Sequence, residues 1–545
     1  MNRRLSVIQA IFILFSLGIV LRLGYWQIVK AADLAAEAAW QRQSFLEIPS
    51  PRGAILSSDG FPLVTNQEAY LFYVNPRQFI FSEKLSQLLP ASASARLANI
   101  PANLGWFLIA RHLPVSLRDQ IQSLKLDAIG FEPDPSRLYP EASSSAHLLG
   151  FVGQDSAGRP QGYFGLEGYY NRQLTGLPGK LVQEKDALNR PILIGTSNLL
   201  PPQPGSALTT SINRTLQFIA YQKLAAALTR YGAVSGTVSI MEPSTGRILA
   251  MVSLPNYDPS DFGRFDQQIY KNPIISDAYE PGSIFKTVVM AAALDAQAVQ
   301  PDTVCDICTG PVAVSDYVIK TWNDKYYPKS TMTEVIQHSD NVGMVFVSRR
   351  LGKRKLISYL KKFGVGQLTG VDLQEESSPQ LRPESAWMDI DPATASFGQG
   401  IAVTPLQMLR AVSVIANRGL LPKPQVVDKI NNKAILPSPP TQVISSMAAA
   451  QMALMMVNAV DLGEAKWAKP KGFSIAGKTG TAQIPVSGHY DADKTIASFV
   501  GFAPADQPKF AMLITLREPK SSPWGSETAA PLWFDIAREV FRLLK

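Results

Sequence analysis

The sequence predicts an α+β protein with a single N-terminal transmembrane helix, an extended mixed α/β module and a larger domain built on a mainly antiparallel sheet. Residues 5–29 are apolar with one interruption, and strand patterns at 235–254 and 494–515 enclose a long region of helical patterns. A last helical pattern follows at 529–544. Strands, then helices, then strands are typical of a sheet covered by helices.

Length and composition limit the possible classes of protein. The chain has 545 residues, 46% of them hydrophobic and 18% charged, and 52 Lys+Arg against 44 Asp+Glu leave a net charge of +8. This is a globular composition, and two cysteines cannot form a disulfide scaffold. The basic stretch 353–362 carries interleaved apolar residues. It therefore predicts an amphipathic helix with a solvated basic face, and we expect no nucleic-acid partner.

The N-terminus predicts the compartment. A helix over residues 5–29, with Arg22 as its one charge, is long enough to cross a bilayer. Arg3 and Arg4 precede it, so the positive-inside rule places residues 1–4 in the cytoplasm and the body of the protein outside. A cleaved signal peptide is the alternative, but the apolar run is long for one. We expect a single-pass membrane anchor.

Further elements follow in chain order. Residues 30–205 mix short strand patterns, such as 70–74, with loops and a helical stretch near 90–125, and the Pro/Gly-rich segment 201–205 predicts a domain boundary. The second domain then covers 206–545. Its predicted helices are 215–228 and 529–544, and its predicted strands are 235–241, 248–254, 473–476, 494–502 and 509–515.

Three short motifs carry candidate chemistry: Ser283-Ile-Phe-Lys286, Ser339-Asp-Asn341 and Lys478-Thr-Gly-Thr481. Pro281 and Gly282 precede the first motif, so Ser283 is predicted at a helix N-terminus, where free N–H groups favour developing negative charge. Lys286 lies one turn further along the same face, within reach of the serine hydroxyl. A second cation, Lys478, would disfavour the charged form of Lys286, as a lysine base requires.

The second and third motifs offer groups for a substrate. Ser339 can relay protons, and Asn341 can hold an amide carbonyl. The residues after Lys478 follow a strand pattern, and such a strand can pair with an extended peptide and bind its carboxylate. These candidate substrate-binding residues are Thr479, Gly480 and Thr481.

Each motif alone is weak, because its ordinary interpretation is an exposed helix turn, a helix N-cap or a solvated turn. Together and in this order they form the known signature of penicillin-binding proteins and class A β-lactamases. With them the chain resembles a class B penicillin-binding protein, a peptidoglycan DD-transpeptidase, over almost its whole length. Further similar stretches are 51–55, 162–176, 396–400 and 404–407, whereas Ser57-Ser58 stands where the family has Asp-Arg.

The resemblance implies a fold and a mechanism. A pedestal module would cover 30–205, and a β-lactamase/transpeptidase-like domain would have helices on both faces of its sheet and an all-helical insert. Ser283 would attack a D-Ala-D-Ala stem peptide and release D-Ala, Lys286 would take its proton, and Ser339 would pass a proton to the leaving amine.

The resemblance also implies how a substrate is held. Asn341 would hold the substrate amide, Lys478 and Thr479 would bind the terminal carboxylate, and the N–H groups of Ser283 and Thr481 would form an oxyanion hole. An amine of a second stem peptide would complete the cross-link, and β-lactams would mimic the donor. No cofactor is implied.

The resemblance extends to partners and location. It implies a bacterial inner-membrane protein that works with a separate multi-pass membrane glycosyltransferase and a division complex. Segments 147–153 and 165–167 look closer to the septal cell-division type than to the elongation type. The alternatives are an elongation-type transpeptidase, a DD-carboxypeptidase or β-lactamase, a β-lactam sensor and a non-catalytic division scaffold. Retention of all three motifs argues against a scaffold.

Two other features are weaker candidates. His338 precedes Ser339, but sequence neighbours usually point apart and no oriented acid is evident, so we do not expect a Ser-His pair. The four histidines show no metal-ligand spacing, and no metal is predicted. Cys305 and Cys308 predict a structural pair, oxidised or reduced, because a redox site would need a βαβ context.

Overall fold

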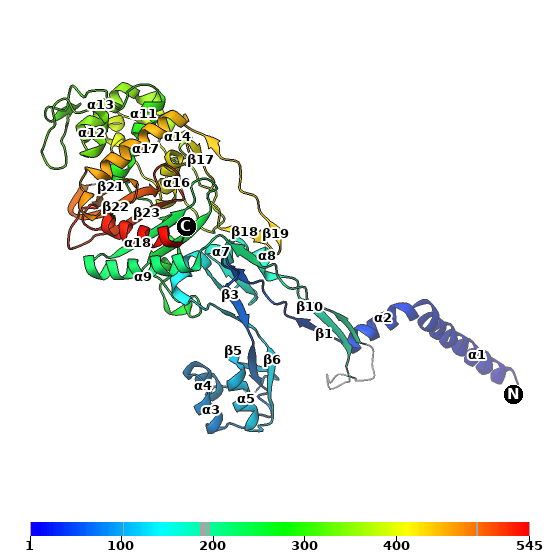
Figure 1. Ribbon diagram of the computed structural model, residues 1–545. Helices are drawn as coiled ribbons and strands as arrows, with labels where there is room; N and C mark the ends of the chain where they lie inside the picture. Colours follow the sequence, from blue (N-terminus) through cyan, green and yellow to red (C-terminus); the bar gives the residue numbers. More distant parts are fainter. Residues whose placement is uncertain (1, 102, 186–191, 193–196, 487–488, 544–545) are drawn as a thin grey trace. The chain divides into compact units, whose positions relative to one another are not determined.

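The computed structural model describes residues 2–101, 103–185, 192, 197–486 and 489–543 (Figure 1). This part of the chain forms two compact units. Unit 1 consists of Met1–Pro51, Tyr70–Asp134 and Gly176–Gly205, and unit 2 consists of Arg52–Ala69, Pro135–Thr175 and Ser206–Lys545. The chain therefore passes repeatedly between the two units before it enters the long last segment of unit 2.

Unit 1 begins with an apolar helix. Helix α1 (Asn2–Gly24) continues into a short π-helical stretch, η1 (Tyr25–Val29). Together, Arg3–Val29 form 27 residues that are long and apolar enough to cross a membrane, and none of the most apolar window is buried. This is the helix that the sequence predicts as the membrane anchor. Helix α2 (Ala31–Arg42) follows.

Two small sheets complete unit 1. The antiparallel sheet β1-β10-β11 consists of Gln43–Ile48, Gly179–Glu184 and Ser197–Leu200. A second sheet, β5-β4-β6, consists of Phe107–Pro114, Ala69–Val74 and Ile129–Pro133. Its helices are α3 (Glu83–Leu88), α4 (Ala91–Ala98) and α5 (Val115–Ser123). Helices α4 and α5 confirm part of the predicted helical stretch near 90–125. Strand β5 interrupts this stretch, because Ile109 and Leu113 reach the core from an extended chain.

Unit 2 begins with a mixed six-stranded sheet. Its order is β19-β18-β12-β2-β3-β7. These strands are Lys433–Ala434, Val427–Ile430, Leu208–Thr210, Ile55–Leu56, Pro62–Gln67 and Ser136–Leu138. The adjoining short elements are η2 (Ala142–Ser145), α6 (Ala146–Leu149), β8 (Phe151–Gln154), β9 (Pro160–Tyr163), α7 (Gly165–Tyr169) and α8 (Asn171–Thr175). The sheet joins segments that lie far apart in the sequence.

The main sheet of unit 2 is antiparallel and has the order β14-β13-β23-β22-β21. Its strands are Ile248–Leu254, Ser235–Met241, Phe510–Arg517, His489–Ala503 and Ala476–Val486. The predicted strands 235–241 and 248–254 agree with β13 and β14. The prediction of a strand at 473–476 is wrong, because β21 begins at Ala476 and contains the third motif.

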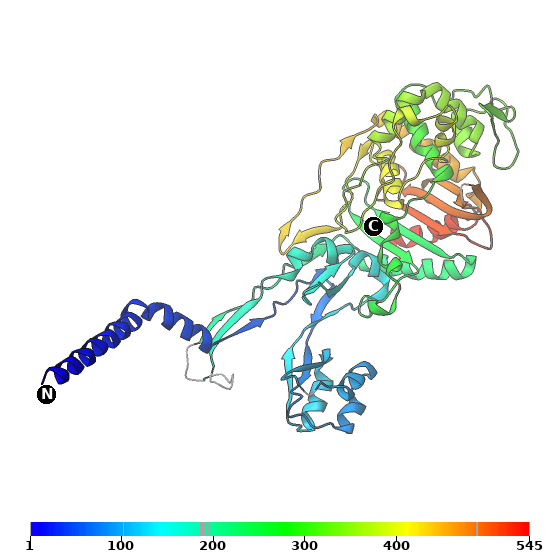
Figure 2. The ribbon, with the colours of Figure 1, turned by 180° about the vertical axis from the view of Figure 1, so that it is seen from behind.

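Helices cover both faces of this sheet, as Figures 1 and 2 show. Helices α9 (Arg214–Tyr231) and α18 (Ala529–Leu543) pack together on one face. Along β23, Met512 and Ile514 join their core, while Ala511 and Leu513 join the core of the helical insert. The sheet is therefore buried on both sides, which explains its continuous apolar sequence.

The helical insert is the segment between β14 and β21. Besides β18 and β19, it contains the short strand pairs β15–β16 (Val312–Val314, Tyr317–Ile319) and β17–β20 (Leu420–Leu421, Thr441–Gln442). Its helices are α10 (Pro273–Ser276), α11 (Lys286–Asp295), α12 (Met332–Gln337), α13 (Asn341–Leu351), α14 (Lys353–Lys362), α15 (Ile390–Ser396), α16 (Pro405–Ala416) and α17 (Ser446–Asp461). The 3-10 turns described in the insert are η3 (Phe262–Arg264), η4 (Gln267–Tyr270), η5 (Gly282–Phe285), η6 (Glu384–Ala386) and η7 (Lys466–Ala468). The basic stretch forms the predicted amphipathic helix, α14.

Candidate active site

Ser283 lies in the tight turn that opens the central helix of the insert. The turn η5 runs directly into α11, and Ser283 remains partly exposed there. Gly282 adopts a left-handed backbone (φ +56°), and its N–H donates to the Gly398 carbonyl at 3.0 Å. A Cβ on Gly398 would lie 2.2 Å from the Gly282 oxygen. The Ser-Phe-Gly-Gln-Gly stretch at 396–400 therefore supports the turn that carries Ser283.

Lys286 connects the first motif to the second. Its side chain is fully buried, and Nζ donates to the Ser339 carbonyl at 2.6 Å, to Ser339 Oγ at 3.2 Å and to Asn341 Oδ1 at 2.8 Å. Burial lowers the pKa of Lys286 well below its usual value, and Lys478 lowers it further, while Asp340 partly opposes both effects. The site therefore favours a neutral amine at Lys286, as a proton acceptor requires.

The second motif lies between two helices. Ser339 follows α12 and adopts a left-handed backbone (φ +56°), which is uncommon outside glycine. The Asp340 carboxylate accepts from the N–H groups of Val342 and Gly343, and so caps α13. Asn341 donates from Nδ2 to the Lys320 carbonyl at 3.0 Å. These contacts hold Ser339 and Asn341 against Lys286.

The third motif lies on β21, the strand at one end of the main sheet. Lys478 is buried, which lowers its pKa, and Nζ donates to the carbonyl and hydroxyl oxygens of Thr479 at 3.1 and 3.2 Å. A Cβ on Gly480 would lie 2.8 Å from Cγ2 of Ile284, so only glycine lets the strand run this close to the turn of Ser283. Among the described residues, the outer edge of β21 has no strand partner, and strand addition by an extended peptide requires such an edge.

The predicted site residues differ in whether hydrogen bonds connect them. Hydrogen bonds join Lys286 to Ser339 and Asn341, whereas Lys478 affects Lys286 through charge alone. No hydrogen bond among the described residues joins the Ser283 hydroxyl to Lys286. The His338 ring stacks on Tyr327 at a centroid distance of 4.0 Å.

Sequence reasoning missed three residues beside the motifs. Glu464 accepts a long hydrogen bond, 3.4 Å, from the Thr479 hydroxyl. The rings of Trp322 and Trp524 meet at 4.8 Å. Both tryptophans lie in loops beside the motifs. The Trp322 N–H donates at 3.4 Å to the carbonyl of His338, which precedes the second motif. Gly525, next to Trp524, donates at 3.0 Å to the Thr481 hydroxyl of the third motif. No local pattern marks these residues, because long-range packing alone brings them here.

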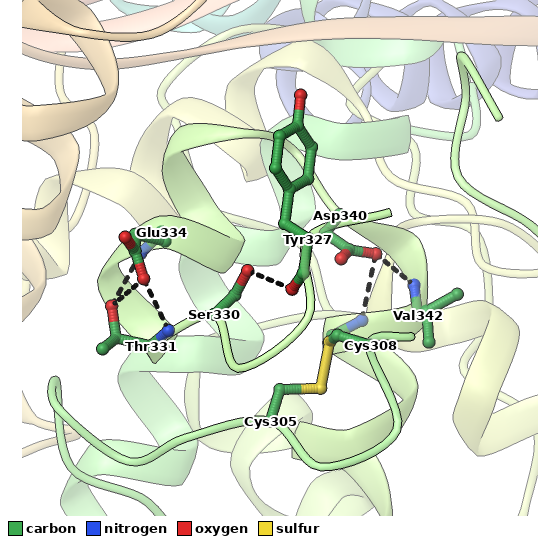
Figure 3. The surroundings of a disulfide bond; sticks show 9 residues. Cys305, Cys308, Tyr327, Ser330, Thr331, Glu334, Asp340 and Val342 are labelled. Carbon is green, nitrogen blue, oxygen red and sulfur yellow. Dashed lines mark hydrogen bonds between the residues drawn. A yellow bond between two sulfur atoms is a disulfide. The ribbon is translucent and has the colours of Figure 1, made fainter. Parts of the chain in front are cut away.

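Cys305 and Cys308 form a disulfide in the segment that leads into α12 (Figure 3). Both side chains are fully buried, and the Cys305 N–H donates to the Ser330 carbonyl at 2.8 Å. The oxidised form of the structural pair is therefore the one present. Among the described residues, no group of three or more His, Cys, Asp or Glu side chains could hold a metal ion.

Comparison with known families and proteins accounts for almost the whole chain. The family Penicillin binding protein transpeptidase domain matches residues 236–541, and the family Penicillin-binding Protein dimerisation domain matches residues 47–210. Stage V sporulation protein D of Bacillus subtilis is 33% identical over 99% of this chain and 85% of its own length. Peptidoglycan D,D-transpeptidase FtsI of Escherichia coli is 30% identical over 98% of this chain and 90% of its own.

A solved structure agrees with these relatives. Penicillin binding protein 3 of Mycobacterium tuberculosis, crystallised in complex with aztreonam, superimposes with a TM-score of 0.71 and 26% identity. The match covers 91% of this chain and 97% of that one. Fold and sequence therefore agree over both units of the molecule.

Proposed function

Because the chain belongs to the class B penicillin-binding proteins and is a serine-type peptidoglycan D,D-transpeptidase, we propose that Ser283 is its nucleophile and Lys286 its general base. The observation that carries this proposal is the buried amine of Lys286, hydrogen-bonded to Ser339 and Asn341 one helical turn from Ser283. Its lowered pKa favours the neutral form that can accept a proton.

The acylation step follows from these positions. Ser283 Oγ attacks the carbonyl of the penultimate D-Ala as its proton passes to Lys286. The tetrahedral intermediate collapses and the bond to the terminal D-Ala breaks. Ser339 gives its hydroxyl proton to the departing amine and regains one from Lys286, whose Nζ lies 3.2 Å from Ser339 Oγ, so Lys286 is neutral again. An ester between Ser283 and the stem peptide remains.

Substrate binding uses the groups around the turn and the strand. An extended donor pairs with the edge of β21, with its amide held by Asn341 and its terminal carboxylate bound by Lys478 and Thr479. The N–H groups of Ser283 and Thr481 stabilise the developing oxyanion, each contributing about 3–4 kcal/mol. The close approach of Gly480 to Ile284 supports this arrangement, since it brings the strand beside the turn of Ser283.

The second half-reaction forms the cross-link. The amine of a second stem peptide attacks the ester carbonyl and gives up one proton. The bond between that carbonyl and Ser283 breaks, a new amide bond remains, and the Ser283 oxygen takes up the proton that the amine has lost. A β-lactam undergoes only the first half-reaction. Its leaving group stays attached to the acyl group, so the acyl-enzyme persists.

We assign this reaction to septal cell-wall synthesis, outside the cytoplasmic membrane. Relatives named FtsI and the resemblance of segments 147–153 and 165–167 favour this role, and another relative is named as a sporulation protein. The basic residues Arg3 and Arg4 favour a cytoplasmic N-terminus. A separate multi-pass glycosyltransferase of a division complex supplies the glycan strands. A fluorescent fusion found along the side wall instead of the septum would contradict the septal assignment.

The catalytic assignment is tested by intact-mass spectrometry of the full chain after incubation with benzylpenicillin. We expect a stable one-to-one adduct that is lost in Ser283→Ala. No adduct with unchanged drug would contradict the nucleophile and favour a scaffold. Rapid drug hydrolysis without a lasting adduct would instead identify a β-lactamase or carboxypeptidase.

A further inference from the structure

Glu464 lies at a rigid corner beside the third motif. The corner joins α17 to η7, and at Gly463 a Cβ would lie 2.2 Å from the Ala459 oxygen and 3.0 Å from the Gln337 oxygen. Ala465 on the other side is 2% exposed. Packing on both sides therefore fixes the backbone that carries the Glu464 carboxylate, between the residues before Ser339 and the strand of Lys478.

The Glu464 carboxylate shares a hydroxyl with Lys478. Thr479 Oγ1 donates to Glu464 Oε2 at 3.4 Å and accepts from Lys478 Nζ at 3.2 Å. The three groups therefore form one polar chain, in which the Thr479 proton points toward Glu464. A hydroxyl has one proton to give, so Thr479 cannot donate to Glu464 and to an incoming carboxylate at the same time.

We propose that Glu464 is a specificity-determining residue, which competes with the terminal carboxylate of the donor for Thr479 and Lys478 and so selects against anionic ligands. The inference rests on the proposed binding of that carboxylate by Thr479 and Lys478. A bound ligand must displace Glu464 from Thr479, and two carboxylates then lie close together and repel each other. The length of the existing bond fits a contact that yields to a ligand.

The electrostatics of the two lysines support this role. Glu464 raises the pKa of Lys478 and of Lys286, in opposition to burial. Loss of its charge would therefore have two effects that need separate readouts. One is a general change in the basicity of Lys286, which acts on every acylating agent. The other acts on anionic agents alone: it is relief of repulsion, partly offset because Lys478 then loses its proton more easily.

The test measures the second-order rate constant of acylation at neutral pH for the full chain in detergent. Two probes are compared, benzylpenicillin and its uncharged methyl ester. In Glu464→Gln we expect the rate with the acid to rise roughly three- to tenfold more than the rate with the ester, the scale of a partly screened charge interaction. Glu464→Thr is measured in parallel, so that a folding defect in one variant does not prevent the comparison.

Asp461→Asn provides the matched control. It removes the same charge at the end of α17, from a surface carboxylate paired with Lys469 and not with Thr479. We expect equal rates with both probes, within twofold of the unsubstituted chain. Equal changes for acid and ester in both Glu464 variants would overturn the inference, although Ser283 acylation itself would stand. Absence of an adduct in the unsubstituted chain would overturn the proposed catalytic assignment, and this inference with it.

Discussion

The Lys286 amine lies 2.8 Å from Oδ1 of Asn341, and this bond joins the starts of two helices of the insert. Helix α11 begins at Lys286, and α13 begins at Asn341. The positive end of the helix dipole disfavours a charged lysine at the start of a helix, and full burial of the side chain disfavours that charge further. The site therefore favours the neutral form of the Lys286 amine, and burial of this amine lowers the stability of the folded protein, as often happens at functional sites.

We predict that Lys286→Met abolishes acylation and stabilises the protein. Between the lowered pKa of folded Lys286 and its ordinary value of 10.5, the unfolded chain binds a proton that the folded chain lacks. Stability therefore rises with pH across this window and is reduced near neutral pH. Removing the amine should raise the Tm by about 2–4 °C. Calorimetry at pH 7 measures the Tm of both proteins. A lower Tm in Lys286→Met would contradict the prediction that burial of the amine destabilises the folded protein.

The same pKa direction predicts the pH profile of acylation. If neutral Lys286 is the base, the rate rises with pH through its lowered pKa and then levels off. We expect the plateau well below the ordinary lysine value of 10.5. Stopped-flow acylation by benzylpenicillin over about pH 5–9 measures the profile. A rate that still rises tenfold per pH unit at the upper end would show a lysine of ordinary basicity.

Gly398→Ala should impair catalysis more than folding. The added Cβ would lie 2.2 Å from the Gly282 oxygen, and φ is +81° at this position. The turn must shift, and a misplacement of about 1 Å in a positioned nucleophile costs about 100-fold in acylation rate. Gly158→Ala is the control, because Gly158 has φ +76° but nothing within 4 Å of its Cβ position. If both variants acylate at the same rate, the contact with Gly282 is unimportant.

Local signals explain which elements could be predicted from the sequence. Strands β13 and β14 agree with prediction because apolar residues and a turn define them without help from distant residues. Strand β21 begins at Ala476, later than predicted, because its extent depends on pairing with β22. The short motifs located the candidate site residues, whereas Glu464 and the contact between Gly398 and Gly282 depend on packing between remote segments.

A buried ion cluster in unit 2 predicts a large stability effect. The fully buried carboxylate of Glu167 lies 2.6 Å from Nη2 of Arg52 and 2.7 Å from Nη2 of Arg137. Glu167→Ala leaves two buried guanidinium groups without their counter-ion, and should lower the free energy of unfolding by about 3–5 kcal/mol. Urea unfolding measures the loss. The control is Glu539→Ala, whose surface pair with Arg542 should contribute less than about 1 kcal/mol, and equal losses would contradict the prediction.

The disulfide between Cys305 and Cys308 should make a smaller contribution to stability. The cysteines are three positions apart, so the bond restricts only a short loop of the unfolded chain. A loop of this length predicts a contribution of about 2 kcal/mol. We therefore expect Cys305→Ala/Cys308→Ala to lower the free energy of unfolding by that amount in urea. Reductant should produce the same decrease in the unsubstituted chain and no change in the double variant. A decrease with reductant in both proteins would show that the effect does not arise from this bond.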